Sequence, residues 1–289
     1  MLLTRNGYDA ATLAAMPRAG RLALWRSLAH PPAMAEPTSK VALITGAARR
    51  IGAVIARDLG REGWAVAVHY GGSAAEAAAV VADIQAGGGR AAAFGADLMS
   101  EMETVSLVRR ACDTLGRVTC LINNASLFER DEPLTVTRDS WERHMQVNLR
   151  APFLLTQTVA RQMPPAASGC IINIIDQRVW NLTPHFTSYT LSKAGLWTLT
   201  KTLALALAPR VRVNAVGPGP TLPSSRQTAE QFERQWSKMP LARPVAPKEI
   251  SAAVRFLLDA PSVTGQMIAV DAGQHLGWIR SMSEQAADE

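Results

Sequence analysis

Tyr189 and Lys193 are the residues whose types and spacing most directly suggest chemistry. They are four residues apart, so on a helix both side chains project from one face. A phenol with a pKa of about 10 is a poor acid–base catalyst at neutral pH, and an adjacent ammonium stabilises the phenolate and lowers that pKa. The pair therefore predicts an acid–base centre in which Lys193 lowers the pKa of Tyr189.

Asp176 lies thirteen residues before Tyr189 and is a second candidate for proton transfer. A carboxyl group can donate a proton to a ring nitrogen when burial or a negative neighbour raises its pKa from about 4. We expect Asp176 and Tyr189 to lie side by side.

A glycine-containing turn runs from Gly46 to Gly52, between a predicted strand and a predicted helix. Such a turn directs backbone N–H groups and the positive end of the helix at a pyrophosphate. We expect it to bind a dinucleotide, and a purely structural turn is the alternative.

The end of the second predicted strand indicates which dinucleotide is bound. NAD enzymes usually place an acidic residue there to hold the ribose 2′-hydroxyl. Here residues 69–73 read His-Tyr-Gly-Gly-Ser and contain no carboxylate. Arg49 and Arg50 belong to the neighbouring turn, and guanidinium groups match a phosphate. NADP(H) is therefore expected rather than NAD(H).

Short apolar runs alternate with longer helical stretches from Lys40 onward. The runs are Val41–Thr45, Ala65–His69, Ala91–Phe94, Cys120–Asn123, Cys170–Ile175, Arg212–Asn214 and Met267–Val270. The helical stretches are 51–62, 74–86, 101–115, 138–162, 188–208 and 248–259, with a shorter one near 227–237. This alternation predicts an α/β fold, a Rossmann-type doubly wound parallel sheet of about seven strands with helices on both faces.

The 289 residues, 48% of them hydrophobic, are expected to form one NADP(H)-binding domain over 40–289. A long irregular segment inside a domain is often functional, so we predict a substrate lid around 220–247. Residues 1–39 are predicted to be an N-terminal extension. They form a flexible or packing arm, an Arg-rich targeting segment, or the product of a start codon upstream of Met34.

Composition argues against several classes of protein. The net charge is +6 with no Lys/Arg run, so nucleic-acid binding is not expected. Cys112, Cys120 and Cys170 form no CxxC pair, so we expect neither a metal site nor a disulfide framework. The longest apolar stretch, 196–208, is interrupted by Lys201 and is too short to cross a bilayer. We expect a cytoplasmic protein that does not bind membranes.

The order of these motifs resembles that of the short-chain dehydrogenase/reductase family over residues 40 to about 278. That family opens with TGxxxGxG and carries YxxxK, here Tyr189 to Lys193. Arg50 stands at the middle glycine, as in the TGxxxRxG of pteridine reductases and dihydromonapterin reductases. Pteridine reductases also carry Asp where most of the family has a serine thirteen residues before the tyrosine, and here that residue is Asp176. The resemblance therefore points to reduction of a C=N bond.

The resemblance implies a role for each landmark. The implied catalytic residues are Asp176, Tyr189, Lys193 and Asn148. The implied substrate contacts are Arg50, Ser126, Phe128, Asp176 and Tyr189. The cofactor contacts expected from the resemblance and from the two strand ends are Gly46, Arg49, Arg50, Ile51, His69, Tyr70, Ser73, Asp97, Leu98, Asn124, Ala125, Ser126, Tyr189, Lys193, Pro218, Gly219 and Thr221. Asn148 would position a proton-relay water, and Phe128 would stack on a pterin ring.

Several of these residues have an ordinary structural alternative. Arg50 could be a solvated residue at a helix start, His69 a common strand-end histidine, and Asn148 a cap or surface residue. Phe128 could be a packed loop residue, and Asp176 could mark a lost serine in an inactive protein.

The expected function is an NADPH-dependent reductase of a pteridine-like C=N bond. The resemblance also implies a homotetramer paired through helices 138–162 and 188–208, where Trp197 and Leu199 are candidates for the interface or for the core. One alternative is a carbonyl or alcohol oxidoreductase of the same family that acts on a ketone. The other is a non-catalytic NADP(H)-binding sensor. In the enzymatic cases the partner is a small molecule, pterin-like or carbonyl.

Overall fold

The computed structural model describes residues 40–224 and 226–277. The predicted extension, 1–39, lies outside the described residues, as do the last twelve positions of the predicted 40–289 domain, 278–289.

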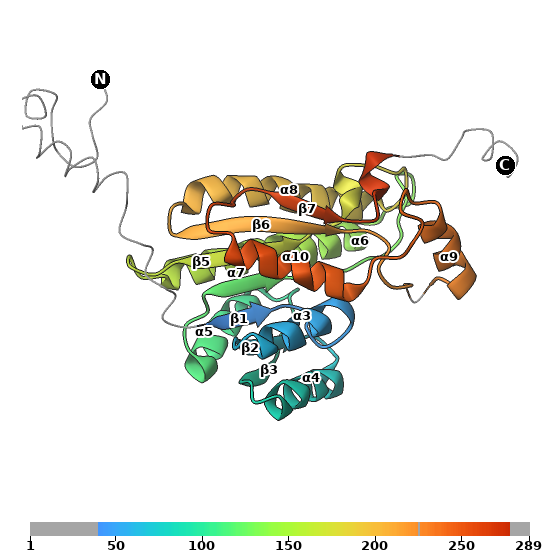
Figure 1. Ribbon diagram of the computed structural model, residues 1–289. Coiled ribbons are helices and arrows are strands. Elements are labelled where there is room, and N and C mark those ends of the chain that lie inside the picture. The colour runs from blue at the N-terminus through green and yellow to red at the C-terminus, as the bar shows by residue number, and fades with distance from the viewer. Residues whose placement is uncertain (1–39, 225, 278–289) are drawn as a thin grey trace, which may run out of the picture.

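A parallel sheet in the order β3-β2-β1-β4-β5-β6-β7 forms the centre of the molecule (Figure 1). Its strands are β1 (Val41–Ile44), β2 (Ala65–Tyr70), β3 (Ala91–Gly95), β4 (Cys120–Asn123), β5 (Gly169–Ile174), β6 (Val211–Pro218) and β7 (Met267–Val270). All four residues of β1 are buried, because β1 lies inside the sheet and is covered on both faces. Apolar runs of this kind are typical of buried parallel strands, and the predicted fold class is confirmed.

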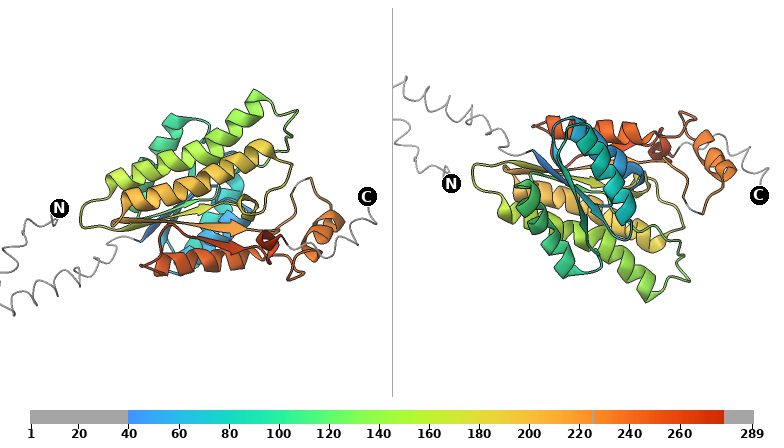
Figure 2. Two further views of the ribbon diagram at one scale, coloured as in Figure 1. Left: turned by 90° about the horizontal axis from the view of Figure 1, so that it is seen from above. Right: turned by 90° about the horizontal axis from the view of Figure 1, so that it is seen from below.

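Helices cover the two faces of the sheet as two layers (Figure 2). One layer holds α3 (Arg50–Arg61), α4 (Ala74–Ala86) and α10 (Pro247–Asp259), and the other holds α5 (Glu101–Leu115), α7 (Ala151–Gln162) and α8 (Thr187–Leu207). Successive strand residues point to opposite layers. Ile44 belongs to the core cluster of the first layer, whereas Leu43 belongs to that of the second.

The long helix predicted over 138–162 contains an irregular turn. It consists of α6 (Arg138–Met145), a π-helical turn η1 (Gln146–Arg150) and then α7. A π turn holds one more residue than an α turn and is frequent at functional sites. The apolar periodicity of the segment does not reveal it, so the sequence predicted one regular helix.

Strand β6 is longer than predicted, ending at Pro218 rather than at Asn214. Its second half pairs with β7, from Ala215 opposite Met267 to Pro218 opposite Val270. The remaining helices and strands match the prediction within one or two residues, including the short α9 (Ala229–Ser237) in the predicted lid.

The order of the sheet creates a crevice at the carboxyl ends of β1 and β4. The chain leaves β1 into α3 on one face, and leaves β4 toward α6 and α7 on the other. Ligands of open α/β sheets bind at such a switch point. Among the described residues, no helix has the length and apolarity needed to cross a membrane.

Candidate active site

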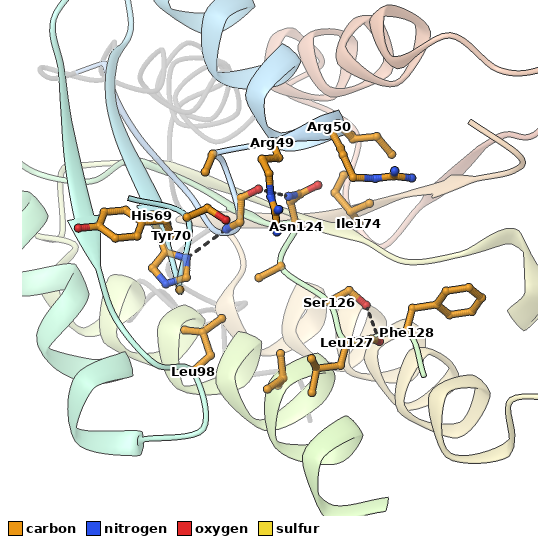
Figure 3. A pocket seen from close by; sticks show the side chains of 18 of the residues that line it. Arg49, Arg50, His69, Tyr70, Leu98, Asn124, Ser126, Leu127, Phe128 and Ile174 are labelled. Atoms are coloured by element: carbon orange, nitrogen blue, oxygen red, sulfur yellow. Dashed lines mark hydrogen bonds between the residues drawn. The ribbon is translucent and has the colours of Figure 1, made fainter. Parts of the chain in front are cut away.

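A cavity of about 790 Å³ opens at the carboxyl ends of the central strands. Its walls come from the turn after β1, the ends of β2 and β4, and the segment after β5 (Figure 3). The volume lies in the range of small-molecule and cofactor sites. The cavity brings together Gly46, Asn124, Asp176 and Tyr189, which are up to 143 residues apart in sequence.

The turn after β1 leaves no space for side chains at its glycines. Gly46 has a φ of +61°, and a Cβ on Gly52 would lie 2.4 Å from the Gly46 carbonyl oxygen. Asn124 Nδ2 donates to the carbonyl oxygens of Thr45 and Gly46 at 2.8 and 3.1 Å. The turn is therefore fixed with its backbone at the cavity wall, as a pyrophosphate site requires.

Arg50 adopts a φ of +55°, the left-handed conformation that favours glycine, which explains why a glycine is common at this position. Its guanidinium donates to the carbonyl oxygens of Leu222 (3.1 Å) and Pro223 (2.9 Å). The sequence predicted contacts to cofactor phosphate and substrate. These two hydrogen bonds connect the predicted lid to the cofactor turn, and Arg50 also lines the cavity, so the predicted contacts remain predictions.

His69 is buried, and both of its ring nitrogens have backbone partners. Nδ1 accepts a hydrogen bond from Gly46 N–H (3.1 Å), and Nε2 lies 3.0 Å from the Ala96 carbonyl oxygen, to which it donates. Burial lowers the pKa of His69, which favours this neutral form. Both ring nitrogens of His69 therefore support the backbone around the glycine turn, while His69 also lines the cavity, so its predicted cofactor contact remains a prediction.

All of the other predicted cofactor contacts except Thr221 line the cavity. The cavity wall includes Gly46, Arg49, Arg50, Ile51, Tyr70, Ser73, Asp97, Leu98, Asn124, Ala125, Ser126, Tyr189, Lys193, Pro218 and Gly219. Arg49 is exposed and lies 3.9 Å from Glu76. Thr221 lies outside this wall, and its hydroxyl donates to the Gly219 carbonyl oxygen at 2.9 Å. The predicted contact of Thr221 with the cofactor remains a prediction.

Tyr189 and Asp176 meet as predicted. Tyr189 Oη donates to Asp176 Oδ2 at 2.8 Å, and Asp176 Oδ1 accepts from the Arg178 backbone N–H at 2.8 Å. Helix α8 supplies Tyr189, and the end of β5 leads directly into Asp176. A carboxyl group and a phenol thus share one proton at the cavity wall.

The pKa of Tyr189 differs from the prediction. Burial, followed by the adjacent Asp176 carboxylate, raises it well above the usual value of a phenol. Lys193 does not counteract this, because its ammonium donates to the Ile174 carbonyl oxygen at 2.9 Å and lies 5.9 Å from the centre of the Tyr189 ring. Burial also lowers the pKa of Lys193 to about 8. Tyr189 is therefore a neutral phenol in this structure.

Asn148 lies in the π-helical turn and is fully buried. Its side-chain oxygen accepts from Leu127 N–H (2.8 Å), and its amide nitrogen donates to the Leu127 carbonyl oxygen and Ser192 Oγ, each at 3.0 Å. These contacts fix the loop after β4. Both side-chain N–H groups of Asn148 thus have protein partners, and its predicted role in positioning a relay water remains a prediction.

Phe128 lies at the cavity wall but is already stacked on another ring. Phe186 is parallel to it, with ring centres 4.5 Å apart, and Tyr189 meets its edge at 4.7 Å. The neighbouring Ser126 donates to the Leu127 carbonyl oxygen at 3.1 Å. One face of Phe128 is therefore covered by Phe186, so a flat ligand has at most the other face.

Comparison with known proteins identifies the family. The sequence profile of short chain dehydrogenases matches residues 40–234, more than half of the chain. The chain belongs to the short chain dehydrogenase family. A 3-oxoacyl-[acyl-carrier-protein] reductase of Synechocystis sp. is 37% identical over 240 residues, 82% of this chain and 97% of that protein.

Solved structures similar to this short chain dehydrogenase include two that contain the phosphorylated dinucleotide. FolM alternative dihydrofolate reductase 1 of Brucella suis, in complex with NADP, is 47% identical, with a TM-score of 0.81 over 85% of this chain and 98% of that chain. A blue fluorescent protein from a metagenomic library, in complex with NADPH, is 34% identical, with a TM-score of 0.75 over 81% of this chain and 97% of that chain.

The sequence of this short chain dehydrogenase did not predict a buried hydrogen-bond network at Ser188, the residue before Tyr189. Asp131 accepts from Ser188 N–H at 3.1 Å and from the hydroxyls of Ser188 and Ser140, the latter at 2.8 Å. His144 Nδ1 lies 2.7 Å from Ser188 Oγ, and its Nε2 accepts from Glu129 N–H at 3.2 Å. Asp131 thus supplies the N-terminal cap that α8 lacks locally, since Phe186 provides no side-chain cap. No motif marks it, because Asp131 and Ser188 are 57 residues apart.

Proposed function

We propose that the cavity binds NADP(H), with the pyrophosphate against the turn after β1 and the 2′-phosphate near Arg49 and Ser73. The glycine turn supports this because a Cβ at Gly52 would meet backbone at 2.4 Å, leaving peptide N–H groups at the wall. Tyr70 and Ser73 line the same wall, and the residues from His69 to Ser73 include no carboxylate that would repel a phosphate. When bound, NADPH supplies a hydride.

We infer further that the protein reduces a C=N bond of a pteridine-like ring. The hydrogen bond of 2.8 Å between Tyr189 Oη and Asp176 Oδ2 is the observation that supports this most directly. Reduction of C=N requires one hydride at carbon and one proton at nitrogen, and a carboxyl group suits proton delivery to nitrogen. The name of the Brucella relatives, alternative dihydrofolate reductase, is consistent with such a substrate.

The residues around the pair explain how it would deliver the proton. For the ring nitrogen to take a proton from Asp176, the carboxylate that accepts from Tyr189 Oη must first gain one from solvent in the cavity, and it returns to the carboxylate form once the ring nitrogen has taken that proton. Tyr189 holds its own proton because burial and Asp176 raise its pKa. Lys193 fixes the Ile174 carbonyl, two residues before Asp176, and its positive charge stabilises the Asp176 carboxylate after the proton has left.

Turnover of Asp176 variants tests the proposal. We expect Asp176→Asn to lower kcat for a dihydropterin by about 100-fold or more, because general acid catalysis contributes at that scale. Its Kd for NADPH should stay close to that of the unmodified protein. Asp113→Asn, which changes an exposed carboxylate on α5, is the matched control. Full pterin turnover by Asp176→Ser would refute the role of the carboxyl group.

Reduction of a ketone is the second candidate function. The Synechocystis relative is named a 3-oxoacyl-[acyl-carrier-protein] reductase, and Staphylococcus aureus proteins with the same name are 34% identical. Here Asp176 replaces the serine that most of the family uses toward a developing alkoxide. Turnover of ketone and aldehyde panels beside dihydropterins distinguishes the two, since only one class should be reduced rapidly.

A non-catalytic NADP(H) sensor is the alternative from another functional class. Loss of NADPH oxidation in Tyr189→Phe, with NADPH binding retained, would reject it. Absence of turnover on every substrate class would favour it.

We also propose a single domain over 40–289 with a lid at 220–247, and a homotetramer paired through α6–α7 and α8. An open groove between these helices supports the pairing and is lined by Trp141, Met145, Leu149, Phe153 and Leu199. Trp197 instead packs within the chain, 6.1 Å from the Trp180 ring. Light scattering on Leu199→Glu would test the assembly, which we expect to dissociate.

A further inference from the structure

Two arginines and two phenylalanines form a stack that reaches the cavity wall through Phe128. Arg178 Cζ lies 5.1 Å from the centre of the Phe186 ring, Phe186 is parallel to Phe128 at 4.5 Å, and Arg226 Cζ lies 5.4 Å from the centre of Phe128. We call these four residues the Arg–Phe stack. They come from the turn after β5, the start of α8, the loop after β4 and the predicted lid, so the stack joins four segments beside the part of the cavity wall that Phe128 lines.

The charges of the stack are not balanced by neighbouring carboxylates. Neither Arg178 nor Arg226 forms a salt bridge with any residue in 40–224 or 226–277. The nearby acidic side chains have other partners. Glu129 pairs with Arg143 at 3.1 Å, and Glu132 pairs with Arg130 and His185 at 2.8 and 2.9 Å.

Asp176 does not neutralise them either. Its carboxylate accepts hydrogen bonds from the Tyr189 hydroxyl and from the backbone N–H of Arg178, but none from the Arg178 guanidinium. The Arg–Phe stack therefore carries two positive charges that have no carboxylate partner in the part of the chain that the structure describes.

Both guanidinium groups also have unused donors. A guanidinium has five N–H groups. Arg178 uses Nη1, toward the Thr183 hydroxyl, and its Nε is buried without an acceptor among the described residues. Arg226 uses Nη2, toward the Phe128 carbonyl oxygen at 2.6 Å. The aromatic faces hold the guanidinium planes in place by cation–π contact, which leaves the other terminal nitrogen of each arginine as the unused donor.

A positive, donor-rich group held rigidly beside a cavity is the usual recognition element for a carboxylate or phosphate. Asp176 and Tyr189 mark the reacting end of the site. The Tyr189 ring meets Phe128 edge-on, with ring centres 4.7 Å apart. In the stack, Arg178 and Arg226 lie beyond Phe186 and Phe128, and neither guanidinium is hydrogen-bonded to Asp176 or Tyr189. An anionic group held there would thus belong to the part of the substrate that does not react.

We propose that the Arg–Phe stack binds a carboxylate or phosphate carried on the non-reacting part of the substrate, with Arg226 and Arg178 as the specificity-determining residues. The assignment rests on the proposed function in taking the cavity as the substrate site, and it adds the chemical class of the substrate. An anionic substituent gains a charge-assisted hydrogen bond that a neutral one cannot make.

Binding of matched ligands tests the stack independently of turnover. Folate and its dimethyl ester share a ring system and differ in two carboxylates, and both can be titrated against the NADP⁺ complex by tryptophan fluorescence. We expect the acid to bind about 10-fold to 100-fold more tightly than the ester, since hydrogen bonds to charged groups contribute about 1.5–3 kcal/mol. The preference should fall with added salt and should shrink in Arg226→Leu and in Arg178→Leu.

Arg234→Leu on α9 is the control, because it removes an exposed arginine outside the stack and should keep the preference. Leu retains much of the apolar contact with the rings, and the circular dichroism spectrum of each variant verifies folding. A second pair, dihydroneopterin and its monophosphate, distinguishes the source of the anion. Preference for folate alone indicates a carboxylate, and preference for the monophosphate alone indicates a phosphate.

Two outcomes separate this inference from the proposed function. Equal binding of acid and ester, and of the phosphate pair, overturns the anion site even if dihydropterins are reduced. A preference that depends on Arg226 and Arg178 supports the anion site even if no dihydropterin is reduced, and in that case only the proposed reaction fails.

Discussion

Lys193 allows a quantitative prediction, because an ammonium at this position is 2% exposed. Burial lowers its pKa from 10.5 to about 8. Between these two values the unfolded chain binds more protons than the folded chain, so the free energy of unfolding rises with pH. At about 1.4 kcal/mol per pH unit, the full effect is roughly 3 kcal/mol. The penalty for the buried charge is complete below pH 8 and disappears toward pH 10.5.

The assay is urea unfolding, at fixed protein concentration, of the unmodified protein and of Lys193→Met between pH 7 and pH 9.5. Met fills similar volume without a charge, so the difference in free energy of unfolding isolates the ammonium. We expect the unmodified protein to gain about 2 kcal/mol relative to the variant over this range. Tyr189, whose raised pKa makes its contribution fall with pH, acts only above about pH 10.

Lys201→Met is the control, because it removes an exposed ammonium from the same helix. Its pH dependence should run parallel to that of the unmodified protein. If Lys193→Met also ran parallel, the ammonium would not carry the inferred burial cost, and the argument for a pKa near 8 would fail.

Three further substitutions test other parts of the site. Arg50→Gly should change the free energy of unfolding by less than about 1 kcal/mol, because glycine tolerates the left-handed backbone and so offsets the lost hydrogen bonds. Limited proteolysis should nevertheless cut the predicted lid faster, and an unchanged rate of cleavage would contradict the inference that Arg50 holds the lid. Asp131→Asn should lower the free energy of unfolding, measured with urea, by about 2–3 kcal/mol, because the new amide N–H groups would face the Ser140 and Ser188 hydroxyls that now donate to the carboxylate. The exposed Asp139→Asn should change it little. Gly52→Ala should raise the Kd for NADPH at least about tenfold in a fluorescence titration, since its Cβ would meet backbone, whereas Gly87→Ala, at the remote end of α4, should not.

The sheet could be predicted because each of its strands and covering helices is encoded by one short continuous stretch of sequence. Each central strand is a short apolar run, and each crossover is a helix of ordinary length, so alternation alone indicated a doubly wound sheet. The pairing of Asp176 with Tyr189 could also be predicted, because both residues lie at fixed positions relative to β5 and α8.

The partners of individual side chains could not be predicted in this way. The identity of Arg50 is visible in the sequence, but the carbonyl groups that it binds are more than 170 residues away. The pKa of Tyr189 depends on the balance between Lys193, Asp176 and burial, and only the folded arrangement shows that burial and Asp176 prevail. The sequence left His69 as either a cofactor contact or an ordinary strand-end histidine, because its two backbone partners are 23 and 27 residues away.

The π-helical turn at Gln146–Arg150 has a consequence for how this chain tolerates length changes. The extra residue places Asn148 against Leu127 while α7 continues onto the sheet. Deleting one residue there would replace the π turn by an α turn, so α7 would keep nearly the same rotation relative to α6. A shortened chain would thus keep its helix content and the face of α7 that packs on the sheet, but would lose the contacts by which Asn148 anchors the loop after β4.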